Sequence, residues 1–225
     1  MAEIVPALLV EDFGNLREEL SKVIDTVNVV QIDVCDGIFT PKATWPYNNK
    51  SETNFEKLLT EQEGLPFWDR LDFEIDLMVS NPKEEAEKWV RVGAKRIILH
   101  YESLDVEDMF GLINELKSLY VEVVIALDID TPVDVLESII ELIDGVQLMG
   151  IQNVGFQHQP FDQEVISKIY EIKEQFPDLL VSIDGGVNQD TAPALVDAGA
   201  DELVVGSAIF GNSDIVGTIE DLKAL

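Results

Sequence analysis

The sequence predicts an α/β fold, a single (β/α)8 TIM barrel in which parallel strands alternate with helices. Short apolar, β-branched runs recur along the whole chain, and each is followed by a stretch with helical periodicity that is rich in Glu and Lys. The spacing agrees, because 225 residues shared among eight strand-helix units gives about 28 per unit, close to the minimum for a strand, a helix and two short loops. No linker rich in Pro, Gly or Ser divides the chain, so we expect residues 1–225 to form one domain.

Each expected strand is an apolar run bounded by polar or turn-forming residues. Near-continuous runs such as VEVVIAL are typical of strands that are covered on both faces, as in a parallel sheet. In chain order, the expected strands are residues 4–10, 29–34, 73–79, 96–101, 122–128, 145–151, 180–185 and 202–209.

Helical periodicity predicts the segments between the strands. The expected helices are residues 15–27, 82–92, 106–119, 133–142, 163–175, 191–198 and 215–225, with 54–60 as a further candidate. Strands that alternate with helices imply a parallel sheet, and we prefer the closed barrel. An open doubly wound sheet is the alternative, and it ranks second because no Gly-x-Gly-x-x-Gly turn follows the first strand.

The charge of the chain is strongly negative, since 15 Lys and Arg against 44 Asp and Glu leave a formal net charge of −29. A general nucleic-acid binder would need clustered cations instead. Cys35 is the single cysteine and cannot form an internal disulfide, and the N-terminus lacks the features of a secretory signal. No apolar run approaches the roughly 20 residues of a membrane-spanning helix. We therefore expect a cytoplasmic protein without nucleic-acid or membrane partners.

Polar side chains gather where the expected strands end, which is the edge at which such barrels carry their active sites. Gln31 and Asp33 are two residues apart on one strand and so point to the same face. Asp76 lies within the third run, and Asp184 closes the seventh. Buried carboxylates must be protonated, paired or metal-bound, so we expect the three aspartates to cluster for function. Two further strand-closing residues are each expected to be satisfied by a loop N–H or by water: His100 and Asp128.

Glycines mark the loops after the seventh and eighth strands. The segments Asp184-Gly185-Gly186-Val187-Asn188 and Gly206-Ser207-Ala208 place bare backbone where a phosphate can approach N–H groups. These two loops are the usual phosphate site of this barrel class. Neither segment carries Lys or Arg, so binding there would rely on backbone dipoles. One such loop would indicate only a tight turn, whereas two loops at these positions favour a phosphate-binding site.

These residues resemble the ribulose-phosphate 3-epimerase family over nearly the whole chain. Each motif is weak alone, and together they are specific. The matching pieces are Pro6-Ala7-Leu8-Leu9, Ile32-Asp33-Val34-Cys35-Asp36-Gly37 with Phe39, Pro41 and Thr44, Leu77-Met78-Val79 with Pro82, His100-x-Glu102, Met149 with Gly155-Phe156, Asp184-Gly185-Gly186-Val187, and Gly206-Ser207-Ala208.

The resemblance implies a barrel of the ribulose-phosphate-binding type, an isomerase of pentose-phosphate metabolism that interconverts D-ribulose 5-phosphate and D-xylulose 5-phosphate. It assigns Asp33 and Asp184 as the acid/base pair acting at C3 through an enediolate, since a single base would return the proton to the face it left. It also implies a homo-oligomer and a divalent metal at Gln31, Asp33, Asp76 and Asp184. The residues that it places at the substrate and its phosphate are Ala7, Met78, Met149, Gly155, His158, Gly185, Gly186, Gly206 and Ser207.

The departures from the family fall at its metal and phosphate positions. Gln31 and Asp76 stand where the family has histidine ligands. If Gln31 uses its carbonyl, the donors are all oxygens, which favours Mg, Mn or Ca over Zn or Fe; a site without metal is the other expectation. Gln157 and His158 replace glycines of the family's phosphate grip, although His158 can itself donate to a phosphate.

Two functions remain open at this point. The first is an active epimerase on a phosphorylated ketose; the alternative is a binding or regulatory barrel that holds a phosphosugar but has lost the metal site and the activity. Retention of Asp33 and Asp184 favours the enzyme. A decarboxylase of a related barrel group has less support, because QIDVCDG and FEIDLMV lack its lysine. Residues 45–49 depart most from the family, and we expect either a loop at the barrel mouth that reshapes the pocket or a variable surface loop.

Overall fold

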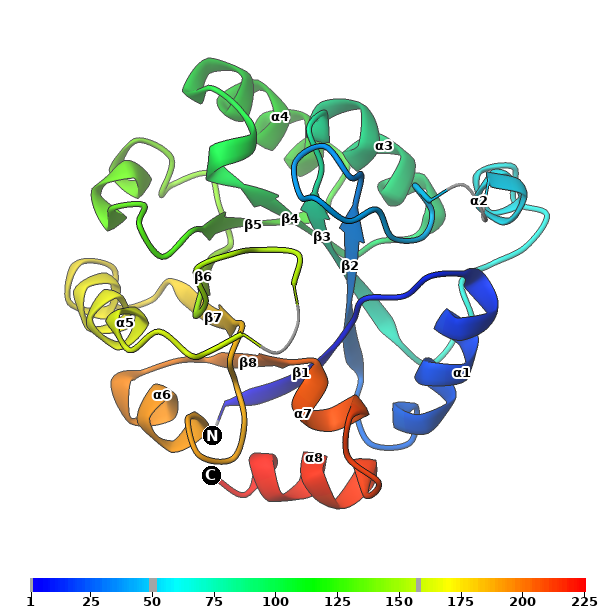
Figure 1. Cartoon of the computed structure of the whole chain (residues 1–225). Helices are drawn as coiled ribbons and strands as arrows, with labels where there is room; N and C mark the ends of the chain where they lie inside the picture. Colours follow the sequence, from blue (N-terminus) through cyan, green and yellow to red (C-terminus); the bar gives the residue numbers. More distant parts are fainter. Residues whose placement is uncertain (1, 49–51, 157–158) are drawn as a thin grey trace.

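Eight parallel strands close into a barrel, as the sequence predicts. The computed structural model describes residues 2–48, 52–156 and 159–225. Each strand pairs with the next along the chain, and β1 pairs with β8 to complete the ring (Figure 1). The strands are β1 (Glu3–Leu8), β2 (Val29–Cys35), β3 (Asp72–Met78), β4 (Arg96–His100), β5 (Glu122–Leu127), β6 (Gly145–Met149), β7 (Leu180–Asp184) and β8 (Glu202–Val205).

Helices surround the barrel on its outer side (Figure 1). They are α1 (Phe13–Val23), α2 (Glu52–Leu59), α3 (Pro82–Val92), α4 (Val106–Ser118), α5 (Glu164–Gln175), α6 (Ala192–Ala198), α7 (Ser207–Phe210) and α8 (Ile215–Lys223). Aspartate N-caps start three of them, because the carboxylates of Asp12, Asp105 and Asp214 accept a backbone N–H from the first helical turn. Among the described residues, no helix is long and apolar enough to cross a membrane.

Two expected elements differ from the structure. The helix expected over 133–142 is only a short 3-10 segment, η2 (Val133–Ser138), and a second such segment is η1 (Tyr101–Ser103). Several β-branched residues in 133–143 lower the helix propensity there. The strand expected over 202–209 ends at Val205, and its last residues form α7 instead. The continuous apolar composition of that run does not distinguish the two structures.

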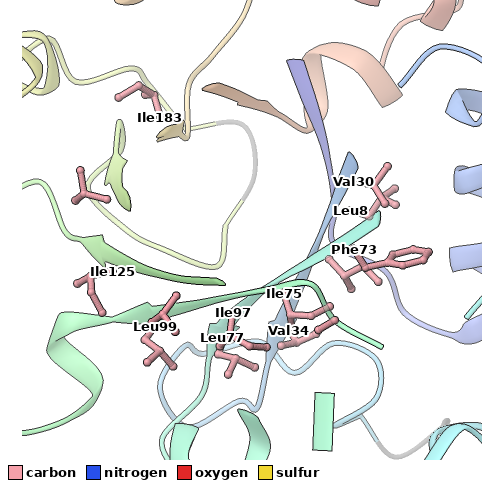
Figure 2. Close-up of a cluster of buried hydrophobic side chains, with 14 of the residues drawn as sticks. Leu8, Val30, Val34, Phe73, Ile75, Leu77, Ile97, Leu99, Ile125 and Ile183 are labelled. Carbon is pink, nitrogen blue, oxygen red and sulfur yellow. The ribbon is translucent and has the colours of Figure 1, made fainter. Parts of the chain in front are cut away.

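The main hydrophobic core lies between the barrel and the helices. Alternate residues of each strand point outward, and Figure 2 shows such side chains leaving the strands on their outer face. They include Leu8, Val30, Val34, Phe73, Ile75, Leu77, Ile97, Leu99, Ile125 and Ile183, all of them buried. The remaining alternate residues face the barrel axis, where two small apolar clusters form around Val5 and Val124. The inner face also holds the polar residues that build the site.

An ion cluster around Arg96 forms the floor of the barrel, at the N-terminal ends of the strands. Arg96 Nη1 donates to Glu74 Oε2 at 2.8 Å and, across the barrel on β8, to Glu202 Oε2 at 2.8 Å. Its Nε donates to Glu122 Oε2 at 3.0 Å. Glu74 and Glu202 are buried, so Arg96 supplies the charge that makes their burial tolerable.

Residues 45–49 depart most from the family, and their first residue, Trp45, lies neither on the surface nor in the pocket lining. Trp45 is completely buried, and its ring packs 5.5 Å from Phe13, 5.8 Å from Phe55 and 5.6 Å from Trp89, measured between centroids. Aromatic packing of this kind contributes to the core between α1, α2 and α3. Both expectations for this segment are therefore wrong at Trp45, while Asn49 lies outside the described residues.

Replacement of Arg96 by methionine is expected to lower the free energy of unfolding by about 3–5 kcal/mol, because two buried carboxylates lose their counter-charge. Urea denaturation followed by circular dichroism measures the change. The matched control is Lys95→Met, which removes a charge from the exposed neighbouring residue. A loss for Arg96→Met within about 0.5 kcal/mol of the control would show that the floor cluster does not stabilise the barrel.

Candidate active site

A cavity of about 400 Å³ opens at the C-terminal ends of the strands. The loop after β6 lies over this opening (Figure 1), and its Ile151, Gly155 and Phe156 help to line the cavity. The structure brings most of the sequence-predicted site residues to this wall, namely Ala7, Asp33, Met78, Met149, Gly155, Asp184, Gly185, Gly186, Gly206 and Ser207. His158 lies outside the described residues.

Three aspartates meet at the base of this cavity. Asp33 and Asp76 are register partners on β2 and β3, and Asp184 ends β7 on the other side of β1 and β8. Each offers a carboxylate oxygen, and these oxygens lie within 4.8 Å of one another. Asp33 and Asp184 also line the cavity, whereas Asp76 is completely buried beside it. The clustering predicted from the strand ends is thus present.

Gln31 links the two aspartates that line the cavity. Its side-chain Nε2 donates to Asp33 Oδ1 at 2.8 Å and to Asp184 Oδ2 at 3.0 Å. Gln31 is completely buried, and its Oε1 has no hydrogen-bond partner within the described part of the chain. The glutamine therefore presents its amide nitrogen to the carboxylates. A metal ligand would instead use the carbonyl oxygen, Oε1.

Asp76 is held by two buried donors. His100 Nε2 lies 2.9 Å from Asp76 Oδ1, and Gln147 Nε2 donates to Asp76 Oδ2 at 3.1 Å. Gln147 lies on β6, across the barrel from β3. The expectation that a loop N–H or water satisfies His100 is wrong, because its partner is a carboxylate on the neighbouring strand.

Burial raises the pKa values of both Asp33 and Asp184. Burial raises the pKa of Asp33 well above its usual range, and the nearby charge of Asp184 raises it further. Burial and then the charge of Asp76 raise the pKa of Asp184 to about 7, against the opposing effect of its hydrogen bond from Gln31. A carboxyl group with a pKa near neutrality can both take up and release a proton under physiological conditions.

The glycines of the β7 loop have conformations and contacts that require glycine. Gly185 and Gly186 have φ of 100° and 71°, in the left-handed region. A Cβ on Gly185 would lie 2.7 Å from Ile151, and one on Gly186 would lie 2.9 Å from Phe161. The loop therefore packs tightly against the segment after β6 and exposes backbone to the cavity. No Lys or Arg is among the described residues that line it.

The donor set is suited to a hard divalent cation. Three carboxylate oxygens converge in a buried position, and Gln31 Oε1 is an unpaired carbonyl oxygen among the described residues. Oxygen ligands of this kind are those that Mg, Mn and Ca use in proteins. No histidine is among the described residues that line the cavity, and His100 instead contacts Asp76, with Nε2 2.9 Å from Oδ1.

Gln147 is the site residue that the sequence reasoning did not identify. The signal is present in GVQLMGI, where Gln147 is the polar residue in an apolar run and shares the inner face with Met149. Other cavity residues that the sequence reasoning did not identify, including Ile151 and Val204, are apolar and carry no chemical signal in the sequence.

Comparison with known proteins gives consistent matches. Residues 3–210 match the ribulose-phosphate 3 epimerase family. The ribulose-phosphate 3-epimerase of Bacillus subtilis is 32% identical over 229 residues, with 99% of each chain covered. That of Methanocaldococcus jannaschii is 33% identical over 228 residues, covering 99% of this chain and 90% of the relative.

Solved structures confirm the architecture. A crystal structure of 3-hexulose-6-phosphate synthase superimposes with a TM-score of 0.73 at 20% identity, covering 99% of this chain and 98% of that one. At this level of identity the likeness shows the barrel fold alone. The sequence relatives confirm the expected enzyme class, because they are named for a carbohydrate-phosphate epimerase. With a family match over most of its length and full-length relatives about one-third identical, this chain belongs to the ribulose-phosphate 3-epimerase family.

Proposed function

We propose that this chain epimerises a phosphorylated ketose at C3, with D-ribulose 5-phosphate and D-xylulose 5-phosphate as the substrate pair. The observation that carries the proposal is the position of Asp33 and Asp184 on separate walls of one cavity, held together by Gln31. The relatives' names support a ribulose phosphate as substrate, and the family resemblance supplies the specific pair. The retention of both aspartates, with raised pKa values, favours an active enzyme over a binding-only barrel.

The chemistry follows from having two carboxyl groups. One ionised aspartate removes the C3 proton from one face of the ketose, and the other, protonated, aspartate delivers a proton to the opposite face of the enediolate. The Gln31 amide donates to both carboxylates and fixes their separation. Burial and repulsion between the carboxylates favour the singly protonated pair that this exchange requires.

The substrate phosphate is assigned to the loops after β7 and β8. Gly185, Gly186, Gly206 and Ser207 line the cavity there, and backbone N–H groups are the donors that glycine-rich loops offer to phosphate. Ala7, Met78, Met149 and Gly155 complete the walls around the sugar. With no cationic side chain among the described lining residues, binding relies on backbone dipoles.

A divalent cation would be held by Asp33, Asp76 and Asp184, with Gln31 as a fourth ligand if its amide turns to present Oε1. Mg, Mn or Ca fits these oxygens better than Zn or Fe. When bound, the cation supplies positive charge beside the oxygens on which negative charge develops.

Incubation with D-ribulose 5-phosphate in deuterated water tests the function. We expect deuterium at C3 in both the ribulose and the xylulose product, measured by NMR, with a higher rate when Mn or Mg is added. No deuterium under any metal condition would reject epimerisation of this substrate. Thermal stabilisation by the sugar phosphate in that case would favour the binding-only barrel.

Single substitutions separate the roles of the two aspartates at the two faces of the substrate. Asp33→Asn and Asp184→Asn are each expected to slow epimerisation by about 10²–10⁴-fold, because each removes one proton carrier. Each variant should still exchange the C3 proton of one epimer, and the two variants should differ in which epimer they exchange. The exposed Asp197→Asn is the matched control. Equal exchange of both epimers by either variant would contradict the two-base assignment.

The raised pKa of Asp184 also predicts a pH-dependent stability. A carboxyl whose pKa is raised from 3.8 to about 7 on folding favours the folded state at low pH and loses that contribution as the pH rises through 7. Asp184→Asn is therefore expected to gain stability over the parent between about pH 5 and pH 8, by roughly 1–3 kcal/mol. Thermal denaturation in EDTA measures it, and a pH-independent difference would contradict the shift.

A further inference from the structure

The buried histidine that holds Asp76 has a second ring nitrogen, which faces another acidic group. His100 is completely buried, and its Nδ1 lies 3.9 Å from Asp128 Oδ1. Neither of these two atoms has a hydrogen-bond partner within residues 2–48, 52–156 and 159–225. A gap of 3.9 Å is too long for an N–H···O hydrogen bond, which spans about 2.7–3.2 Å. The two atoms therefore lie at ion-pair distance without sharing a hydrogen bond.

Glu102 completes the group. Its Oε1 accepts the backbone N–H of Asp128 at 3.1 Å and the hydroxyl of Thr131, so the carboxylate is fixed beside the end of β5. His100, Glu102 and Asp128 each offer one ligand atom, and these atoms lie within 4.8 Å of one another. Glu102 is exposed and Asp128 is partly exposed, so the group lies at the edge of the protein interior, whereas the ring nitrogen itself is buried.

We propose that His100 Nδ1, Glu102 and Asp128 form a second divalent-cation site, separate from the aspartate cluster and selective for a transition ion of the Mn, Fe or Zn type. The spacing supports it, because a metal with ligand bonds of about 2.1 Å bridges a nitrogen and an oxygen 3–4 Å apart. An imidazole with two carboxylates is a donor set that such ions accept better than Ca or Mg do.

The hydrogen bond on the other side of the ring matches this role. A metal-ligating histidine usually donates its remaining ring N–H to a carboxylate, which fixes the ring and the tautomer. His100 Nε2 lies 2.9 Å from Asp76 Oδ1, so the same arrangement is present with Nδ1 as the ligand atom. A cation there would lock the ring that positions Asp76. This links the second site to the active-site cluster through a single side chain.

Charge also favours a cation. Asp76, Glu102 and Asp128 surround one imidazole, and the single ammonium of Lys168, which acts on Glu102 and Asp128, offsets only part of their charge. Its Nζ donates to the backbone oxygens of Asp128 at 2.7 Å and of Thr131 at 2.6 Å. Lys168 therefore orders the loop after β5 through its backbone.

The histidine content of the chain makes the test direct. His100 and His158 are the two histidines, and the aspartate cluster offers oxygen ligands. In the His158→Gln protein, pulsed EPR of bound Mn should therefore show directly coordinated ¹⁴N from His100. Adding Glu102→Gln and Asp128→Asn should remove that coupling and weaken this binding by about 10–100-fold in a Mn titration, leaving the nitrogen-free site.

The control replaces Asp33 by Asn in the His158→Gln protein, which should weaken the nitrogen-free site and leave the ¹⁴N coupling. Circular dichroism verifies that each variant is folded. Absence of ¹⁴N coupling, no Mn binding, or coupling that survives the Glu102 and Asp128 substitutions would each overturn the proposal. The readout requires no sugar turnover, so it is independent of the proposed function.

Discussion

The constraint on which this structure depends is the neutralisation of carboxylates that face the axis of a closed barrel. Glu74 and Glu202 point inward at the floor, and Asp33, Asp76 and Asp184 meet at the mouth. Ionised groups cannot be buried without partners, so the barrel closes only if each end supplies donors from its inner face. The two ends meet this requirement with different chemistry.

At the floor the donor is a full charge. Arg96 reaches across the barrel and pairs with carboxylates from β3, β5 and β8, which ties these strands together at their N-terminal ends. At the mouth the donors to Asp33 and Asp184 come from the neutral amide of Gln31. Burial nevertheless raises the pKa at both ends, to about 8 for Glu74 at the floor and to about 7 for Asp184 at the mouth. The two ends differ in access instead, because Asp33 and Asp184 line the cavity, whereas Glu74 is buried and does not line it.

The site departs from its family at two buried, hydrogen-bonded positions. Gln31 and Asp76 occupy the two positions at which the resemblance places histidine ligands, and each enters a new hydrogen-bond pair within the barrel. Gln31 bridges the acid/base aspartates, and Asp76 is oriented by His100 and Gln147. The imidazole of His100 lies between Asp76 and Asp128, with Nε2 toward the first and Nδ1 toward the second. One buried ring thus has a carboxylate on each side, Asp76 at Nε2 and Asp128 at Nδ1.

The barrel, its strand positions and the aspartate cluster were predictable from the sequence, because alternation of apolar runs and the placement of polar residues at strand ends are local patterns. The partners of these groups were not. The Arg96 cluster, the Gln31 bridge and the Gln147 contact join strands that lie across the barrel, and Trp45 is buried by aromatic rings from three separate segments. A sequence states which side chains are present at each strand end, whereas the distances across the axis, and therefore the charges each group feels, arise only when the barrel closes.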